Sequence, residues 1–167
     1  MTTIVADFNN KIMVSDTRCS YGGTVFRMIK IHKAPDGTLI GFSGNVTEAT
    51  KFVEWFMSGH NKAKVPRFGD DAFDALTMND EGIMLWDSSL VATKVNQSFF
   101  AVGSGAQYAI GAMKAGASAE KAVTIATEED SCSGLPLDTR EYIKLKTKKP
   151  RNQKVKPLVV KDSKRVA

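Results

Sequence analysis

The chain has 167 residues, a formal net charge of +5 and a hydrophobic content of 43%. This length is enough for one domain with its own buried core, and two cysteines are too few for a disulfide framework. The sequence shows neither a secretory leader pattern nor an apolar run that would cross a bilayer, so we expect a cytoplasmic protein with no membrane segment.

Charge is distributed very unevenly along the sequence. Ten of the 23 basic residues, but only two of the 18 acidic ones, lie in residues 141–167, so this segment carries +8 and residues 1–140 carry −3. The basic run at residues 146–151 has no interleaved aromatic residues to stack on bases, so nucleic acid is not the expected partner. We expect one domain over residues 1–147 and a basic tail or terminal strand over residues 148–167.

Short strands separated by turns are predicted for the first part of the chain. The expected strands cover residues 2–8, 11–16, 24–26, 28–32 and 38–42. Asn9 and Asn10, between the first two strands, suit a two-residue hairpin turn with positive φ angles.

The spacing of the apolar residues then changes, and a helix is predicted at residues 48–57. Phe52, Trp55 and Phe56 fall on one face of this helix, and Asn45 and Thr47 are the candidate N-caps. The helix therefore has an aromatic face that requires a partner surface.

The rest of the chain predicts a meander, two helices and terminal strands. Strands are expected at residues 72–78, 82–87, 90–94 and 98–102, helices at 106–115 and 119–129, and terminal strands at 142–147 and 156–160. Ser118 is the expected N-cap of the last helix. Strands and helices in separate groups indicate an α+β protein.

Histidine-based hydrolysis and nucleotide binding find little support in the sequence. The two histidines are His32, at the end of a predicted strand, and His60, in a predicted loop, and neither is expected to be a catalytic base. Gly103-Ser104-Gly105 lacks the third glycine of a dinucleotide-binding fingerprint.

Thr2 offers a different chemistry because it directly follows the initiator Met1. If Met1 is removed, Thr2 carries a hydroxyl nucleophile and a free α-amine on one residue. The amine can then act as the base for its own hydroxyl, which activates a weak oxygen nucleophile without histidine.

Six segments of the chain resemble, in order and approximate spacing, motifs of the N-terminal-nucleophile threonine peptidases, the family of proteasome β subunits and HslV. The matching segments are Thr2-Thr3-Ile4-Val5, Met13-Val14-Ser15-Asp16, Lys30-Ile31, Gly41-Phe42-Ser43-Gly44, Ala101-Val102-Gly103-Ser104-Gly105 and Asp130-Ser131-Cys132-Ser133-Gly134. The resemblance covers residues 2–140. It implies a four-layer αββα sandwich.

The chain departs from this family between Gly44 and Gly103, where it is shorter than HslV. The missing residues correspond to the second of two paired helices, so the helical layer on that side is expected to be reduced. The aromatic face of the predicted helix must then pack on the sheet or against a neighbouring subunit.

The resemblance also implies catalytic roles. Thr2 Oγ would attack a peptide carbonyl, with Lys30 as a nearby cation and Asp16 holding Lys30 charged and oriented. The remaining implied residues are the oxyanion donor Gly41 and an outer network of Ser104, Asp130 and Ser133.

Substrate, cation and partners are implied in the same way. Substrate would add as a strand. The implied substrate-binding residues are Arg18, Ser20, Leu39 and Ser43. No cofactor is required, although the carbonyls of Thr127, Asp130 and Ser133 match a loop that holds a monovalent or Mg cation in some relatives.

The implied activity is hydrolysis of unfolded polypeptides inside a homo-oligomeric single or double ring, with an ATP-dependent unfoldase as an optional partner. Two alternatives stay open. One is an amidase with the same nucleophile that acts on a small amide. The other is a non-catalytic ring scaffold that uses the basic tail.

Overall fold

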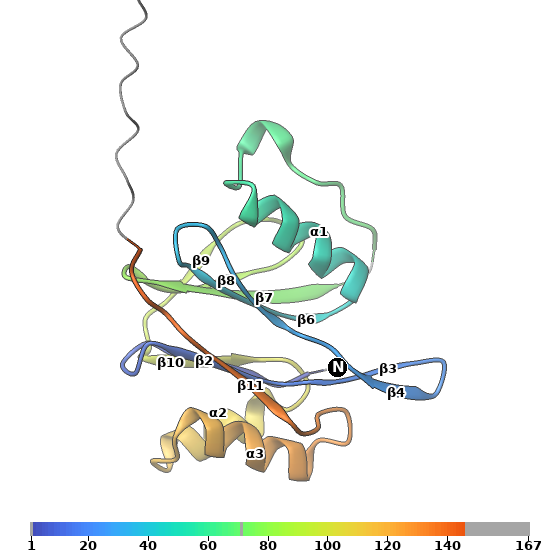
Figure 1. Ribbon diagram of the computed structural model, residues 1–167, viewed down its shortest axis with the longest axis vertical. Coiled ribbons are helices and arrows are strands. Elements are labelled where there is room, and N and C mark those ends of the chain that lie inside the picture. Colours follow the sequence, from blue (N-terminus) through green and yellow to red (C-terminus); the bar gives the residue numbers. More distant parts are fainter. Residues whose placement is uncertain (1, 71, 146–167) are drawn as a thin grey trace, which may run out of the picture.

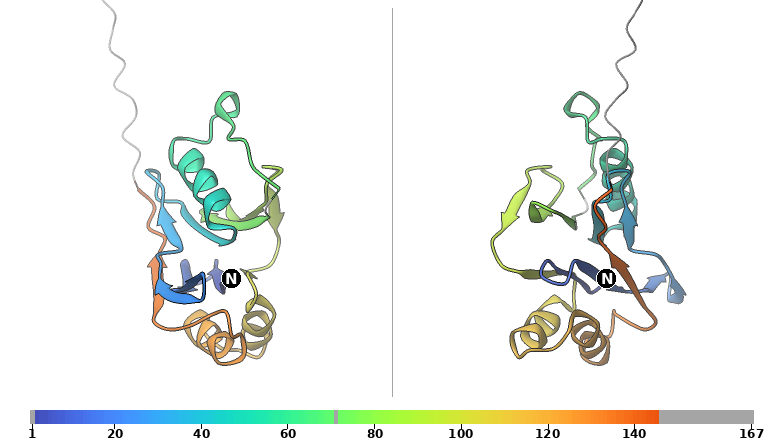
Figure 2. Two further views of the ribbon diagram at one scale, coloured as in Figure 1. Left: turned by 90° about the vertical axis from the view of Figure 1, so that its right-hand side faces the viewer. Right: turned by 60° about the vertical axis from the view of Figure 1, so that its left-hand side comes forward.

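The computed structural model describes residues 2–70 and 72–145, which form four layers (Figure 1). A pair of helices covers one antiparallel sheet, a second antiparallel sheet stacks on the first, and a single helix covers the outer face of the second sheet. Figure 2 shows the same layers from two further directions. The predicted α+β sandwich with a reduced helical layer is confirmed.

The first sheet carries the N-terminal strand in its interior. Its strands in spatial order are β10 (Phe99–Val102), β1 (Ile4–Asp7), β2 (Ile12–Asp16) and β11 (Leu137–Glu141). Consecutive apolar residues give β1 two buried faces, because neighbouring side chains of a strand point to opposite sides: Ile4 faces the second sheet and Val5 faces the helices.

Helices α2 (Ala106–Lys114) and α3 (Ala119–Glu129) cover the outer face of this sheet. Ser118 caps α3, as predicted, by accepting a hydrogen bond from the Lys121 amide. The buried helix residues are mostly alanines, so both helices approach the sheet closely.

The second sheet provides the other half of the core. Its strands in spatial order are β5 (Ile31–Lys33), β6 (Leu39–Gly44), β7 (Phe73–Asn79), β8 (Gly82–Trp86) and β9 (Thr93–Val95). Leu39, Leu76 and Met78 face the first sheet and pack with Ile4 and Met13. These contacts fix the distance between the two sheets.

Helix α1 (Val46–Met57) lies alone on the outer face of the second sheet (Figure 1). Asn45 caps it by accepting from the Glu48 amide, as predicted. Phe52 is 0% exposed, and its ring centroid lies 5.5 Å from those of both Phe73 and Trp86. The aromatic face therefore packs on the sheet of its own subunit. A short 3₁₀ turn, η1 (Lys62–Lys64), follows in the loop before β7.

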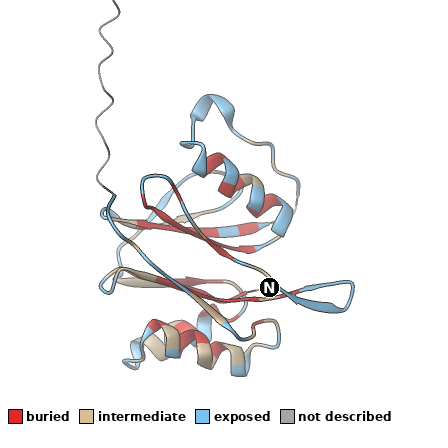
Figure 3. Ribbon diagram, viewed as in Figure 1, coloured by how far each residue is buried: buried red, intermediate tan, exposed pale blue. Residues whose placement is uncertain are grey.

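A two-stranded hairpin of β3 (Arg18–Tyr21) and β4 (Thr24–Arg27) projects from the side of the molecule (Figure 1). Figure 3 shows that it is mostly exposed, whereas the facing sheets are buried. It leaves the first sheet directly after β2, so its base lies at the end of the sheet where the chain begins.

Two local predictions were wrong. The connection between β1 and β2 is a four-residue turn, and Lys11 is the residue in it with a positive φ, 57°. The Asp7 carboxylate accepts a hydrogen bond from the Asn10 amide. This bond favours the longer turn over the predicted two-residue Asn9-Asn10 hairpin. The strand that pairs with β2 is β11, in which Leu137 lies opposite Asp16, and residues 142–145 of the strand predicted at 142–147 are not in a strand. The last two residues of that prediction lie outside the described residues.

The predicted strand at residues 156–160 and the basic tail at residues 148–167 lie outside the described residues. Within the described part of the chain, every helix is too short or too polar to cross a membrane.

Candidate active site

A buried ion pair between Lys30 and Asp16 forms the centre of the site. Lys30 is 1% and Asp16 0% exposed, and Lys30 Nζ lies 2.8 Å from Asp16 Oδ1. Lys30 Nζ also donates to the Arg18 carbonyl at 2.6 Å. Burial lowers the pKa of Lys30, while the hydrogen bond to Asp16 works in the opposite direction. The ammonium is held by acceptors on both sides.

Asp16 connects this ion pair to the start of the chain. Antiparallel pairing of β1 with β2 brings Asp16 opposite Thr3, and Asp16 Oδ1 accepts from the Thr3 amide at 3.0 Å. Asp16 Oδ2 accepts from the amides of Arg18 and Gly134, each at 3.0 Å. One carboxylate therefore fixes the backbone of three segments that are distant in sequence.

A second network of hydroxyl groups lies on the other side of Thr3. Thr3 Oγ1 and Ser133 Oγ are 2.7 Å apart, and Asp130 Oδ2 accepts from Ser133 at 2.7 Å and from Ser104 at 2.6 Å. Burial alone would raise the pKa of Asp130, but the hydrogen bonds from Ser104 and Ser133 lower it below its usual value. Asp130 thus acts as the common acceptor of this network.

The turn from β10 into α2 approaches the chain start so closely that only glycine fits. A Cβ on Gly103 would lie 1.9 Å from the Thr2 carbonyl oxygen, and Gly103 has a φ of +99°. A Cβ on Gly105 would lie 2.0 Å from Thr3 Oγ1. Because the two glycines have no side chains, this turn packs directly against residues 2 and 3, and Ser104 lies beside Asp130.

The structure therefore brings most of the predicted catalytic residues together. Two networks that contact Thr3, the residue next to Thr2, contain the five predicted residues Asp16, Lys30, Ser104, Asp130 and Ser133. Thr2 itself is 5% exposed, and its carbonyl lies against the Gly103 turn. Sequence reasoning missed Thr3, which contacts both networks. Its duplication of Thr2 was a signal, but a side chain one residue along a strand points to the opposite face.

Gly41 lies in the middle of β6, between Ile31 of β5 and Leu76 of β7. Its Cα faces the first sheet, where an added Cβ would meet Met13 Sδ at 2.7 Å. The following amide, that of Phe42, donates to the Lys30 carbonyl. The oxyanion role of Gly41 stays a prediction.

The four predicted substrate residues occupy different environments. Arg18 begins β3 and packs on Gly134, whereas Ser20 is exposed on the hairpin. Ser43 is buried, and its Cβ lies 3.4 Å from the position of a Cβ on Gly103. Leu39 is 0% exposed within the core between the sheets. A role for Leu39 in a pocket would require this core to open.

The predicted cation loop is partly occupied by its own hydrogen bonds. The Asp130 carbonyl accepts from the Ser133 amide at 3.0 Å, and Thr127 Oγ1 donates to the Thr124 carbonyl. Among the residues that the structure describes, no three His, Cys, Asp or Glu side chains form a group suited to a metal ion. Binding of a cation by these carbonyls stays a prediction.

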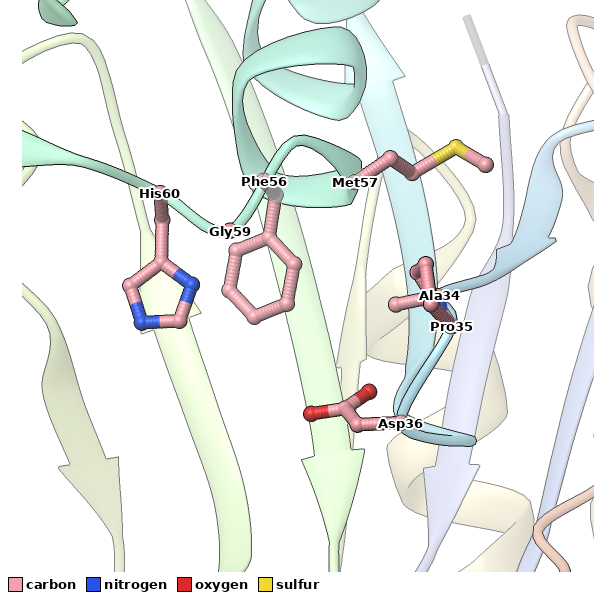
Figure 4. Close-up of a pocket in the computed structure, with 7 residues that line it drawn as sticks. All are labelled: Ala34, Pro35, Asp36, Phe56, Met57, Gly59 and His60. Atoms are coloured by element: carbon pink, nitrogen blue, oxygen red, sulfur yellow. The ribbon is translucent and has the colours of Figure 1, made fainter. Parts of the chain in front are cut away.

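Figure 4 shows a separate pocket of about 140 Å³ at the end of α1. The rings of Phe56 and His60 stack with centroids 4.8 Å apart, and the Asp36 carboxylate lies below them. The lining residues include no serine, threonine or cysteine. This pocket therefore has the imidazole of His60 but no hydroxyl or thiol side chain.

Comparison with solved structures identifies the fold. The chain is similar to eukaryotic HslV from Trypanosoma brucei, with a TM-score of 0.64 and 23% identity over 83% of this chain and 98% of that chain. It is also similar to BPH from Thiobacillus denitrificans (TM-score 0.61, 24% identity) and to BPH in complex with epoxomicin (0.60, 22%), each covering 85% of this chain and 98% of the other. No family model and no curated protein matches the sequence. The chain has the fold of HslV and BPH.

Proposed function

We propose that this chain is a threonine peptidase in which Thr2, made N-terminal by removal of Met1, hydrolyses peptide bonds of unfolded polypeptides. The observation that carries the proposal is the position of Thr2. Its backbone lies against the Gly103 turn, and its neighbour Thr3 contacts both the Asp16–Lys30 pair and the Ser133–Asp130–Ser104 network. The similarity of fold to HslV and BPH supports the same reading.

The reaction begins when Thr2 Oγ attacks the peptide carbonyl carbon. The hydroxyl proton passes to the Thr2 α-amine, directly or through a water molecule, and a tetrahedral oxyanion forms. Collapse of this intermediate breaks the C–N bond, and the proton goes to the leaving amine. Water then hydrolyses the ester on Thr2 by the same steps, which regenerates the hydroxyl.

In the proposed mechanism the buried networks influence the pKa of the Thr2 α-amine, which is the base. A free α-amine has a reference pKa of about 7.7–8.0, close to neutral pH. In this proposal the Lys30 ammonium, which shares Asp16 Oδ1 with the Thr3 amide, disfavours the protonated form of the Thr2 α-amine and leaves that amine free to accept a proton. Asp16 holds Lys30 in place, and the Ser133 hydroxyl orients the Thr3 side chain.

Assembly into a ring completes the proposal. The neighbours HslV and BPH support a homo-oligomer that confines Thr2 in a chamber, reached by unfolded chains alone. A ring follows when one heterologous interface repeats and closes.

Adduct mapping tests the nucleophile. The purified chain is first weighed by mass spectrometry to confirm loss of Met1 and then incubated with epoxomicin, the compound bound in the BPH complex. We expect an adduct on Thr2. Thr2→Ala should abolish both the adduct and peptide hydrolysis, and Thr2→Ser should retain part of each.

The control variant is Thr50→Ala, the same change at an exposed threonine of α1, which should leave the adduct and peptide hydrolysis intact. Unchanged peptide hydrolysis by the Thr2→Ala variant would contradict the mechanism. Hydrolysis of small amides without hydrolysis of an unfolded protein would favour the amidase. A chain that forms rings but has no threonine-dependent hydrolysis would be the scaffold.

A further inference from the structure

A pocket of about 210 Å³ lies between the β3–β4 hairpin and the segment that follows Ser133. Its lining residues are Arg18, Val25, Phe26, Arg27, Gly134 and Leu135. It adjoins the candidate active site, because the Arg18 carbonyl accepts from Lys30 and the Gly134 amide donates to Asp16. A ligand in this pocket would lie next to the catalytic networks.

Two arginines face each other across the hairpin. Arg18 of β3 is directly opposite Arg27 of β4 in the antiparallel register, so both side chains stand on the same face. Like charges at directly opposite positions destabilise a strand pair. This arrangement is costly unless an anion lies nearby.

Both side chains are held in place by neighbours rather than by acids. Gly134 packs on the aliphatic part of Arg18, where an added Cβ would lie 3.0 Å from Arg18 Cδ. The Arg27 guanidinium donates to the Leu135 carbonyl, and at 3.5 Å to Thr17 Oγ1. The carbonyl and hydroxyl acceptors position Arg27 without neutralising it.

The carboxylate of Asp16, which is bonded to the backbone of this pocket, has no capacity left for either arginine side chain. Both oxygens of Asp16 are already used, by Lys30 and the Thr3 amide on one side and by the amides of Arg18 and Gly134 on the other. No ion pair within the described residues involves Arg18 or Arg27. Two positive charges therefore line the pocket uncompensated.

We infer that this pocket is a substrate subsite that binds an acidic side chain of the peptide. Guanidinium groups bind carboxylates through charge-assisted, often bidentate, hydrogen bonds. Val25 and Phe26 supply apolar contacts for the methylene groups of a glutamate. The inference rests on the proposed function, since it assigns the pocket to the substrate of that site.

Peptide binding to a variant that cannot hydrolyse peptides tests the subsite independently of catalysis. The Thr2→Ala chain is titrated against fluorescent peptides that differ only by glutamate or glutamine at one position, scanned along the peptide. At one position we expect the glutamate peptide to bind about tenfold more tightly, with the preference weakening as salt increases.

Arg27 carries the specific part of the test. Arg27→Gln should remove the preference for the glutamate peptide over the glutamine peptide, and Arg27→Lys should retain part of this preference. Arg67→Gln, the same change on an exposed loop by α1, should leave it intact. Unfolding midpoints of all three variants show whether the hairpin remains folded.

Equal affinity for the paired peptides at every position, or no binding of either, would overturn the inference. Loss of oligomer mass in Arg27→Gln together with equal peptide affinities would assign the arginines to a contact between subunits. If the preference is found but no Thr2 adduct forms, the proposed function fails and the subsite stands.

Discussion

Lys30 and Asp16 are fully buried, and each is the main charged contact of the other. Removing one partner of a buried ion pair leaves the other charge unpaired, which typically costs about 3–5 kcal/mol. A variant at either position would therefore change the stability of the fold together with the chemistry. Thr2, whose hydroxyl is not part of this pair, is the cleaner residue for a test of mechanism.

Asp130 allows a prediction about pH. Its folded-state pKa lies below the ordinary value of 3.8, so its contribution to stability is present above that value and is lost as the pH falls through the folded pKa. We expect the wild type to be more stable than Asp130→Asn at pH 6, with the gap narrowing below pH 3.8. Urea unfolding across this pH range measures the gap.

Asp70→Asn, on an exposed loop, is the control for loss of one negative charge. A gap between the wild type and Asp130→Asn that stays constant, or widens, in acid would contradict the assigned hydrogen-bond network.

Among the elements, the turn between β10 and α2 has the tightest contacts with the chain start. Gly103 combines a positive φ with a close approach to Thr2. Gly111, within α2, has neither, since an added Cβ would meet nothing within 4 Å. The same substitution at these two glycines should therefore have opposite effects.

Gly103→Ala should lower the free energy of unfolding by about 2–4 kcal/mol, from strain at positive φ and from overlap with the Thr2 carbonyl. Gly111→Ala should raise it by about 0.5–1 kcal/mol, because alanine is the better helix former. Chemical denaturation of both variants measures the difference. A Gly103→Ala variant as stable as the wild type would contradict the close contact between Gly103 and the Thr2 carbonyl.

At the scale of the whole molecule, the exposed hairpin and the open side of α1 are surfaces that an assembly would use. A groove of about 550 Å³ beside α1 is lined by Trp55, Trp86, Leu90 and other residues. Among the described residues, α1 is the one α-helix on this face of the second sheet, so the groove beside it is a surface that a ring could cover.

We expect the native protein to have a mass several times the 18.2 kDa of one chain. Native mass spectrometry and electron microscopy would count the subunits and show whether one or two rings form. A chain truncated after residue 147 should form the same ring if the basic tail is solvated, and a smaller species if the tail joins subunits. A monomer at working concentration would contradict the ring.

Much of the architecture was predictable because it depends on local sequence. Two apolar runs on either side of a turn predicted β1 and β2, the spacing of Phe52 and Trp55 predicted α1, and Asn45 supplies its cap. The short polar strand β11 was missed because its pairing with β2 depends on a distant part of the chain.

The candidate site divides in the same way. The sequence, through its resemblance to the threonine peptidases, determined which residues stand in motif order, from Thr2 through Asp16 and Lys30 to Asp130. Only the tertiary structure placed Thr3 between two networks and brought the two arginines of the hairpin beside Gly134 and Leu135. The physical reason is that strand register and backbone approach are decided by packing between distant segments, and no local pattern encodes them.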